Sequence, residues 1–351
     1  MKKAFVRVLA LVLAAVLLSA CADSPMNNTD PTPPPTAPEL LRLEIAAMPD
    51  KTDYVLGERF DPAGLVVNAI MSDGSVLKDV AWSVDENLVL MTNTTEVPIR
   101  YNGKSVPLPI RVRHPGNVDE YAVANFPTLE DSPLKGKSFF WLGSSVTLGA
   151  SSLNESMADF IAKKYDCLCI KEAVSGTTLA DYKENSYVER LDAYLAAADR
   201  PAHMDAVIVQ LSTNDQNEPE KFGIVTSKEV TAPEAFDTAT TFGAMEYIIA
   251  RVQETWGCPV LFYTNPPTGR SSYMDMVFGL YEIATKWDVE VIDLFIDSEF
   301  NSLPTEEQRD LWMTDKIHPT KAGYRDWWLP KFEETLLRLD EVTDSLKEEV
   351  R

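Results

Sequence analysis

Two kinds of hydrophobic pattern divide the chain, and one gives way to the other near residue 135. In residues 41–45, apolar and polar side chains alternate, which is the period of a half-buried strand. Turn residues such as Ser72-Asp73-Gly74 and Asn102-Gly103 then interrupt residues 41–113 at regular intervals. This pattern predicts roughly seven short strands that pack as an all-β sandwich.

Beyond residue 135, short apolar runs alternate with stretches of helical periodicity. Because strand and helix alternate, the pattern predicts a parallel sheet with helices on both faces. Reactive groups in such sheets collect at the carboxyl ends of the strands. The expected strands are 138–142, 167–171, 206–211, 260–263 and 289–294, and the expected helices are 156–165, 187–197, 235–255 and 274–287.

The first twenty residues predict a lipoprotein signal peptide. Three basic residues precede an apolar run at 8–18 that is too short to span about 30 Å of hydrocarbon. Leu18-Ser19-Ala20-Cys21 resembles a bacterial lipobox, which implies that Cys21 becomes lipidated; the alternative is an ordinary cleavage site with an incidental cysteine. We therefore expect an exported protein, lipid-anchored to the outer face of the bacterial cell membrane, with membrane contact only through Cys21.

The composition predicts a flexible tether and argues against nucleic acid and anionic lipid as partners. Residues 21–40 are rich in Pro, Thr, Asp and Asn, so they cannot bury enough apolar surface to fold and predict a flexible Pro-rich tether. The 351 residues include 54 acidic and 32 basic side chains, a formal charge of −22. This balance argues against nucleic acid and against electrostatic adhesion to anionic lipid. The expected divisions are signal peptide 1–20, tether 21–40, sandwich 41–113, connector 114–135 and α/β domain 136–345.

The cysteines predict neither a disulfide framework nor a zinc site. With Cys21 assigned to lipid, Cys167, Cys169 and Cys258 remain, and an odd number fits no complete set of bridges. Cys167 and Cys169 would point to the same face of a strand, which is poor geometry for a mutual bridge. No CxxC spacing with a nearby histidine occurs, so we expect buried core thiols and no metal.

A candidate nucleophile lies in Gly143-Ser144-Ser145, where the first α/β strand ends and a helix begins. A serine there has an exposed hydroxyl, and the helix N-terminus favours developing negative charge. The motif differs from the G-x-S-x-G elbow because Thr147 occupies the final position, which argues against an α/β-hydrolase.

One of the three histidines has a suitable partner. His114 and His203 lie in loops and are expected to be solvated, whereas His318 follows Asp315 by three residues. On a turn, that spacing lets the carboxylate reach the imidazole and fix its tautomer, as in a Ser-His-Asp triad. We therefore expect the Ser145 hydroxyl within about 4 Å of a His318 ring nitrogen.

Four blocks in order resemble those of the SGNH (GDSL-type) hydrolase superfamily, over residues 136–340. They are Gly143-Ser144-Ser145, Ser175-Gly176-Thr177-Thr178, Ser212-Thr213-Asn214-Asp215 and Asp315 to His318. The resemblance implies an α/β fold with a flavodoxin-like, three-layer parallel sheet. Residues 51–74 similarly resemble bacterial Ig-like domains, which implies an N-terminal Ig-like sandwich for spacing or adhesion, with a passive spacer favoured over a ligand-binding role.

The same resemblance implies a serine esterase that needs no metal or organic cofactor. Ser145 is its nucleophile, His318 the general base and Asp315 the partner of the imidazole. The amides of Ser145 and Gly176 and the side chain of Asn214 form its oxyanion hole. The alternative is a structural role, in which Asn214 caps the next helix.

Two departures from the family pattern bear on the substrate: Ser144 replaces an Asp and Ser212 replaces a Gly, and both are expected close to the pocket. Near His318, the chain also holds Trp312, Trp327 and Trp328. Core packing is expected for Trp327 and Trp328, whereas sugar stacking stays open for Trp312.

The expected substrate is an acylated small molecule or glycan, with short O-acyl groups such as acetyl on extracellular or cell-wall glycans preferred. One alternative is a lipase or lysophospholipase with the same triad. Another is a non-catalytic surface adhesin whose hydrolase domain has decayed.

Overall fold

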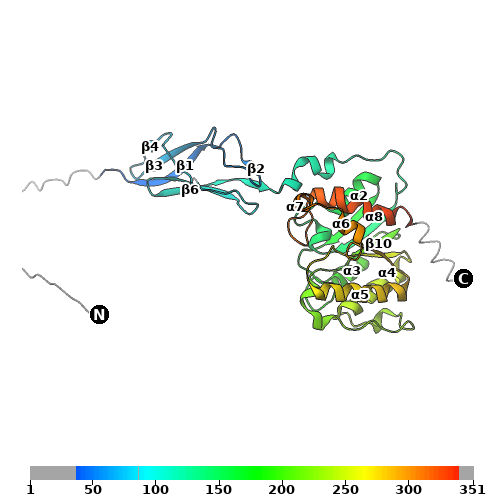
Figure 1. Ribbon diagram of the computed structural model, residues 1–351. Helices are drawn as coiled ribbons and strands as arrows, with labels where there is room; N and C mark the ends of the chain where they lie inside the picture. Colours follow the sequence, from blue (N-terminus) through cyan, green and yellow to red (C-terminus); the bar gives the residue numbers. More distant parts are fainter. Residues whose placement is uncertain (1–36, 86, 340–351) are drawn as a thin grey trace, which may run out of the picture.

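The computed structural model describes residues 37–85 and 87–339, which form an N-terminal β unit and a C-terminal α/β unit (Figure 1). The signal peptide, Cys21 and residues 22–36 of the tether lie outside the described residues, as do residues 340–345 of the expected α/β domain. Among the described helices, none is long and apolar enough to cross a membrane.

The N-terminal unit is all-β, as the alternation predicts. Its strands are β1 Leu40–Ala47, β2 Asp53–Val55, β3 Val66–Met71, β4 Val76–Leu77, β5 Glu96–Tyr101, β6 Lys104–Pro109 and β7 Arg111–Arg113. β1 with β3, β3 with β4 and β5 with β6 pair antiparallel, whereas β2 and β7 pair in parallel. Alternate side chains such as Val67 and Ala69 in β3, and Val97 and Ile99 in β5, are fully buried in one core. One buried face per sheet is the arrangement of a sandwich.

The second unit contains a five-stranded parallel sheet. Its strands are β8 Ser138–Gly143, β9 Leu168–Ala173, β10 Ala206–Gln210, β11 Val260–Tyr263 and β12 Glu290–Ile292. The spatial order is β12-β11-β10-β8-β9, and every neighbouring pair is parallel. This is the flavodoxin-like order, so the predicted fold class is confirmed. The strand order reverses between β8 and β10, and ligands bind outside the carboxyl ends of strands at such a point.

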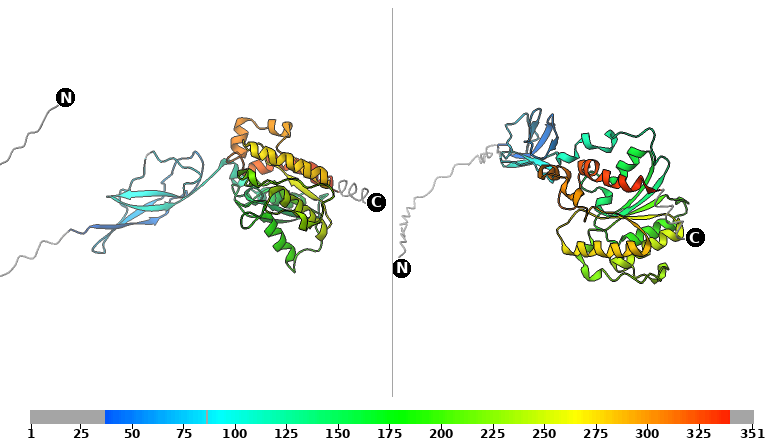
Figure 2. Two further views of the ribbon diagram at one scale, coloured as in Figure 1. Left: turned by 90° about the horizontal axis from the view of Figure 1, so that it is seen from below. Right: turned by 45° about the vertical axis from the view of Figure 1, so that its right-hand side comes forward.

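Helices cover both faces of this sheet (Figure 2). The α-helices are α1 Ser145–Leu148, α2 Met157–Tyr165, α3 Tyr187–Ala196, α4 Thr241–Thr255, α5 Ser271–Trp287, α6 Ser298–Ser302, α7 Glu306–Trp312 and α8 Leu329–Leu336. α3, α4 and α5 lie on one face, and α2 and α8 lie on the other (Figure 1).

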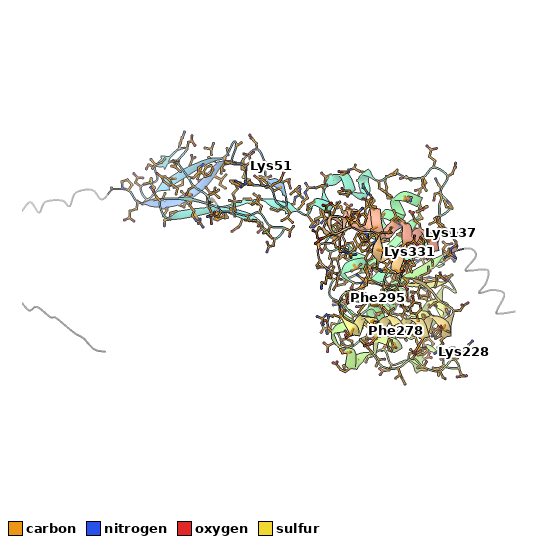
Figure 3. The ribbon with its side chains drawn as sticks, viewed as in Figure 1. Lys51, Lys137, Lys228, Phe278, Phe295 and Lys331 are labelled. Atoms are coloured by element: carbon orange, nitrogen blue, oxygen red, sulfur yellow. The ribbon has the colours of Figure 1, made fainter. Side chains whose placement is uncertain are left out.

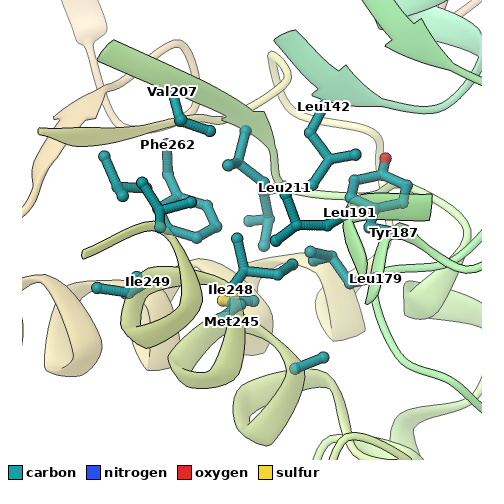
Figure 4. Close-up of a cluster of buried hydrophobic side chains, with 14 of the residues drawn as sticks. Leu142, Leu179, Tyr187, Leu191, Val207, Leu211, Met245, Ile248, Ile249 and Phe262 are labelled. Carbon is teal, nitrogen blue, oxygen red and sulfur yellow. The ribbon is translucent and has the colours of Figure 1, made fainter. Parts of the chain in front are cut away.

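Alternate residues of β8 divide between the two faces. Phe140 and Leu142 pack in the core with α3, α4 and α5, whereas Phe139 and Trp141 pack with α2 and α8. Figure 4 shows Leu142 in the first of these cores, together with side chains from β10, β11 and α4. Burial on both faces explains why these strands read as continuous apolar runs. On the outside, Phe278 of α5 remains 51% exposed (Figure 3).

Short turns complete the second unit. The connector contains 3-10 turns η1 Pro115–Asn117, η2 Asp119–Tyr121 and η3 Val123–Asn125; later come η4 Asp215–Asn217, η5 Pro219–Lys221 and η6 Pro233–Ala235, and a π-helical turn, η7 Gly323–Trp328, precedes α8. The junction between the units is short, because β7 ends at Arg113 and η1 begins at Pro115. Arg113 of β7 forms a 2.7 Å ion pair with Asp119 of the connector.

Two predicted boundaries are wrong. The helix expected from residue 235 begins at Thr241, because the Thr240 hydroxyl accepts the Gly243 amide at 3.3 Å and caps it there. The strand expected over 289–294 is only β12, because the side chain of Asp293 accepts the amides of Phe295 and Ile296 and starts a turn.

The cysteine prediction is partly wrong. Cys258 is buried, but Cys167 and Cys169 are half-buried. They lie at the start of β9, which is an edge strand of the sheet and so is covered less completely. Their sulfur atoms are 4.0 Å apart, and neither is bridged to a cysteine within the described ranges.

A buried ion pair joins α4 to α5. The Glu246 carboxylate is fully buried and accepts hydrogen bonds from Lys286 Nζ, from Trp287 Nε1 at 3.1 Å and from the Thr226 amide at 3.0 Å. Lys286 is itself buried, with 7% of its side chain exposed. Removing one member of a buried pair leaves an uncompensated charge.

We predict that Glu246→Ala lowers the free energy of unfolding by about 3–5 kcal/mol, because Lys286 then stays buried without its counter-charge. The matched control is Glu254→Ala on the same helix, whose ion pair with Arg251 is half-exposed. The control changes stability by less than about 1 kcal/mol. Urea unfolding followed by circular dichroism measures both, and equal losses in the two variants contradict the prediction.

Candidate active site

Ser145 lies at the turn from β8 into α1 and is buried. The turn requires glycine at position 143, because a Cβ there would lie 1.7 Å from Thr147 Oγ1. The Ser145 amide is the first of α1 and therefore has no acceptor within the helix. It is available to a negatively charged group in front of the turn.

Gln210, the last residue of β10, is fully buried and forms hydrogen bonds with this turn. Its Oε1 accepts hydrogen bonds from the amides of Ser144 at 3.0 Å and Thr147 at 3.2 Å, and from the Thr147 hydroxyl at 2.9 Å. The Thr147 hydroxyl also bonds to Tyr263 Oη at 2.6 Å. The turn that carries Ser145 is thereby tied to β10 and β11, both deep in the core.

His318 reaches Ser145 from a separate segment. Its Nε2 is 2.8 Å from Ser145 Oγ, within the expected distance of about 4 Å. Its Nδ1 is 2.8 Å from Asp315 Oδ2. Because a carboxylate only accepts, we assign the ring proton to Nδ1, which leaves Nε2 free to accept from the serine hydroxyl.

Asp315 is fixed by backbone as well as by the ring. Its Oδ1 accepts the amides of Ile317 at 2.7 Å and His318 at 2.8 Å. Burial acts to raise the pKa of Asp315, but the hydrogen bonds from the His318 ring and these two amides outweigh it and lower the pKa to about 2. The group is therefore a carboxylate at neutral pH, as the partner of an imidazolium must be.

Gly176 and Asn214 follow β9 and β10, so parallel pairing brings them to the same edge of the sheet as Ser145. Gly176 has φ +82, and no described atom lies within 4 Å of the position that a Cβ would take, so its backbone is open to the site. Asn214 Nδ2 donates to the Thr177 carbonyl at 2.8 Å. Within the described part of the chain, the Asn214 side chain makes no cap bond to η4, which removes support from the helix-cap alternative.

Asp215 joins the two loops that carry Gly176 and Asn214. It is fully buried, and its carboxylate accepts the amides of Leu179 at 2.9 Å and Ala180 at 3.2 Å. Burial raises the pKa of Asp215, and these amide bonds oppose that rise. The carboxylate thus fixes the Gly176 loop relative to the residue beside it, Asn214.

Arg190 of α3 links the same loop to β8, the strand before Ser145. Its Nη2 donates to the Gly143 carbonyl at 2.8 Å and to Thr177 Oγ1 at 3.2 Å, and its Nη1 donates to the Glu172 carbonyl at 2.9 Å. The residue is only 9% exposed. One guanidinium therefore connects the ends of β8 and β9 with the loop after β9.

Sequence reasoning did not single out Gln210 or Arg190, and it gave Asp215 no role. A weak signal exists for Gln210 and Asp215, because each is a polar residue at or just after the end of an otherwise apolar strand. Arg190 has no such signal, since an arginine in a helix is ordinarily solvated.

The other serines and histidines named from the sequence differ in burial. Ser144 and Ser212 are fully buried: the Ser144 hydroxyl lies 3.3 Å from Gln210 Oε1, and the Ser212 hydroxyl accepts the Asn214 amide at 3.1 Å, so their closeness to the pocket stays a prediction. His203 is exposed as expected, but His114 is half-buried: its Nδ1 accepts the Gly116 amide at 3.2 Å. Burial lowers the pKa of His114, and Asp310 opposes this.

Two of the three tryptophans near His318 stack on each other. Trp327 and Trp328 are buried, as expected for core residues. Trp312 is half-buried and stacks on Trp327 with ring centroids 5.8 Å apart. Its ring therefore already has an aromatic partner on one face.

A cavity of about 510 Å³ lies beside Asp315. Its lining comes from the loop after β11 and from the end of α7 and the segment that follows: Pro266, Pro267, Gly269, Arg309, Asp310, Met313, Thr314, Asp315 and Lys316. Over residues 37–85 and 87–339, no group of three His, Cys, Asp or Glu side chains is arranged to hold a metal ion.

Comparison with solved structures finds chains similar to the α/β unit at low identity. A protein from Lactobacillus plantarum is 19% identical with a TM-score of 0.47, over 57% of this chain and 96% of that one. Est24, a carbohydrate acetylesterase from Sinorhizobium meliloti, is 14% identical with a TM-score of 0.37, over 56% and 99%. The acetyl xylan esterase AlAXEase is 17% identical with a TM-score of 0.40, over 56% and 98%. No curated protein sequence matches the chain.

Comparison with family profiles gives matches in both units. The profile of bacterial Ig-like domains (group 3) matches residues 47–112. The profile of the GDSL-like lipase/acylhydrolase family matches residues 141–325, which is more than half of the chain and includes Ser145, Gly176, Asn214, Asp315 and His318. The chain therefore belongs to the GDSL-like lipase/acylhydrolase family and carries a bacterial Ig-like domain ahead of its hydrolase domain.

Proposed function

We propose that this protein is a serine esterase that hydrolyses carboxylic esters through an acyl-enzyme intermediate. The observation that carries the proposal is the chain of two 2.8 Å contacts from Ser145 Oγ to His318 Nε2 and from His318 Nδ1 to Asp315. In this mechanism, His318 Nε2 takes the Ser145 proton while Oγ attacks the ester carbonyl carbon. The imidazolium then gives its proton to the leaving alcohol, and water releases the acid by the same steps in a second half-reaction.

Negative charge develops on the carbonyl oxygen during each attack. We assign its stabilisation to the amides of Ser145 and Gly176 and to the Asn214 carboxamide, which lie beyond the ends of β8, β9 and β10. The Asn214 amide nitrogen keeps a second hydrogen for this purpose, since only one is directed at the Thr177 carbonyl. Asp215 and Arg190 hold these loops in place before the substrate arrives, so little reorganisation is needed during the reaction.

Short O-acyl groups, such as acetyl groups on extracellular or cell-wall glycans, are the substrates that we favour. The segments after β8, β9 and β10 are mainly polar: Ser144-Ser145, Ser175-Gly176-Thr177-Thr178 and Ser212-Thr213-Asn214. A long acyl chain would need an apolar groove, and these residues supply no large apolar side chain, so a lipase or lysophospholipase has less support. The cavity beside Asp315, with charged residues among its lining, is large enough for a sugar ring on the alcohol side.

We also propose that the enzyme is exported and held at the outer face of the cell membrane through a lipidated Cys21. The support is the sequence alone: Leu18-Ser19-Ala20-Cys21 follows an apolar run and precedes a Pro-rich segment. The segment and the Ig-like domain then lie between the anchor and the hydrolase domain along the chain, which suits action on a surface glycan.

We expect the protein to hydrolyse 4-nitrophenyl acetate, with kcat/KM falling steadily from acetate through butyrate and octanoate to palmitate. Ser145→Ala should lose at least about a thousandfold in kcat, because the nucleophile is gone while the fold is kept. Ser144→Ala, whose hydroxyl faces Gln210, should keep most of the activity.

Three outcomes would contradict these expectations. A rise of kcat/KM with chain length would favour the lipase alternative. Absence of hydrolysis by wild-type protein for every ester would favour the adhesin alternative, and full turnover by Ser145→Ala would remove Ser145 from the mechanism.

Asn214→Ala should lower kcat on the order of a hundred- to a thousandfold, because one donor to the transition-state oxygen is lost. KM should change little, since that bond strengthens only as charge develops. Kinetics and melting temperature are to be measured on the same preparation. A destabilised variant with normal kcat would mean that Asn214 acts only through its bond to the Thr177 carbonyl.

A further inference from the structure

The connector that joins the Ig-like domain to the hydrolase domain packs directly against the segment after His318. A Cβ on Gly116 in η1 would lie 2.4 Å from Thr320 Oγ1 of this segment and 2.1 Å from the Leu311 carbonyl of α7. Further along, Arg325 donates to the Glu120 carbonyl at 3.0 Å. The connector precedes the family-profile match, which begins at residue 141.

Asn117 is the most buried polar side chain of the connector, at 5% exposure. Its Nδ2 donates to the Ser151 carbonyl at 2.7 Å, and its Oδ1 accepts the Lys321 amide at 2.9 Å. Ser151 follows Ser145 by six residues, and Lys321 follows His318 by three. A single carboxamide therefore bridges the segment that carries Ser145 and the segment that carries His318.

A carboxylate, that of Glu155, forms a second bridge close to the Asn117 carboxamide. The Glu155 carboxylate accepts Lys321 Nζ at 2.7 Å through Oε1 and the Val123 amide of the connector at 2.7 Å through Oε2. Lys321 is almost fully buried, with 5% of its side chain exposed. The segment that carries Ser145, the segment that carries His318 and the connector thus meet in one polar cluster, defined by Asn117, Ser151, Glu155, Lys321 and the Val123 amide. Asn117 and Lys321 are buried in it, and Ser151 and Glu155 are half-buried.

We propose that Asn117 is a positioning residue for ester hydrolysis, which makes the connector part of the catalytic unit. The inference rests on the proposed function, because the distance that Asn117 controls is the one between Ser145 Oγ and His318 Nε2. Catalytic groups must be held within about 0.5 Å of productive geometry, and a displacement of about 1 Å can lower turnover about a hundredfold. Asparagine suits the role because it donates to one segment and accepts from the other with one rigid group.

The test compares Asn117→Leu and Asn117→Asp with wild-type full-length protein. Leucine is similar in size and loses both bonds, whereas aspartate keeps the acceptor for Lys321 and loses the donor to Ser151. The matched control is Asn125→Leu, since Asn125 is an exposed residue of the same connector that bonds only to the Asp119 carbonyl within it. We measure kcat and KM for 4-nitrophenyl acetate, the second-order rate of inactivation by a fluorophosphonate, and the melting temperature.

Asn117→Leu is expected to lower kcat at least about tenfold with KM within about twofold, at a temperature where the variant is fully folded. The fluorophosphonate rate should fall by the same factor, because it reports the same attack by Ser145. Asn117→Asp should show a smaller loss in both quantities, and Asn125→Leu should match wild type. Should Asn117→Leu fail to fold, the same two rates for Asn117→Asp decide the matter.

A purely structural role predicts something else: a lower melting temperature with unchanged kcat and inactivation rate per folded molecule. That result, for either Asn117 variant, overturns the proposal while leaving the esterase assignment intact. Wild-type protein that neither hydrolyses the ester nor reacts with the fluorophosphonate would instead overturn the proposed function itself.

Discussion

The 2.8 Å contact between Ser145 Oγ and His318 Nε2 joins residues that are 173 positions apart in the chain. Ser145 is carried by the end of β8 and so inherits the rigidity of the parallel sheet. His318 is carried by a turn between α7 and η7 and lies outside every described strand. The position of His318 comes from backbone bonds within its turn, such as the Thr314 amide to the His318 carbonyl at 2.9 Å, and from side-chain contacts that tie this turn to the rest of the domain.

These contacts act on both sides of the triad. On the serine side, Gln210 Oε1 accepts hydrogen bonds from the turn, and Arg190 donates to the Gly143 carbonyl just before it. On the histidine side, Asp315 fixes its own loop by accepting two amides, and the Asn117 and Glu155 cluster ties Lys321 back toward the serine. Gln210, Arg190 and Asn117 are buried, so their bonds are stronger than they would be in water, and each unmade bond there would be costly. Such a network sets one geometry rather than a range of them.

The sequence predicts the parts of this arrangement that are local. The apolar run of β8, the glycine that follows it and the three-residue spacing from Asp315 to His318 can all be read in a few consecutive residues. The contacts made by Gln210 and Asn117 cannot, because their partners lie 66 and 204 residues away and follow no period. The predicted ends of one helix and one strand were wrong for a related reason. The capping bond of Thr240 and the turn at Asp293 depend on single side chains rather than on a repeating pattern. Half-burial of Cys167 and Cys169 follows from the edge position of β9, which only the strand order reveals.

The most direct test of the proposed mechanism is to find which residue attacks an electrophile. Wild-type protein is treated with a fluorophosphonate, digested and analysed by mass spectrometry, with His318→Ala treated alongside. We expect one adduct per molecule, located on Ser145, loss of ester hydrolysis in proportion to labelling, and almost no adduct in His318→Ala. An adduct on Ser144 or on a serine outside the 143–145 turn, or hydrolysis that continues in fully labelled protein, would contradict it.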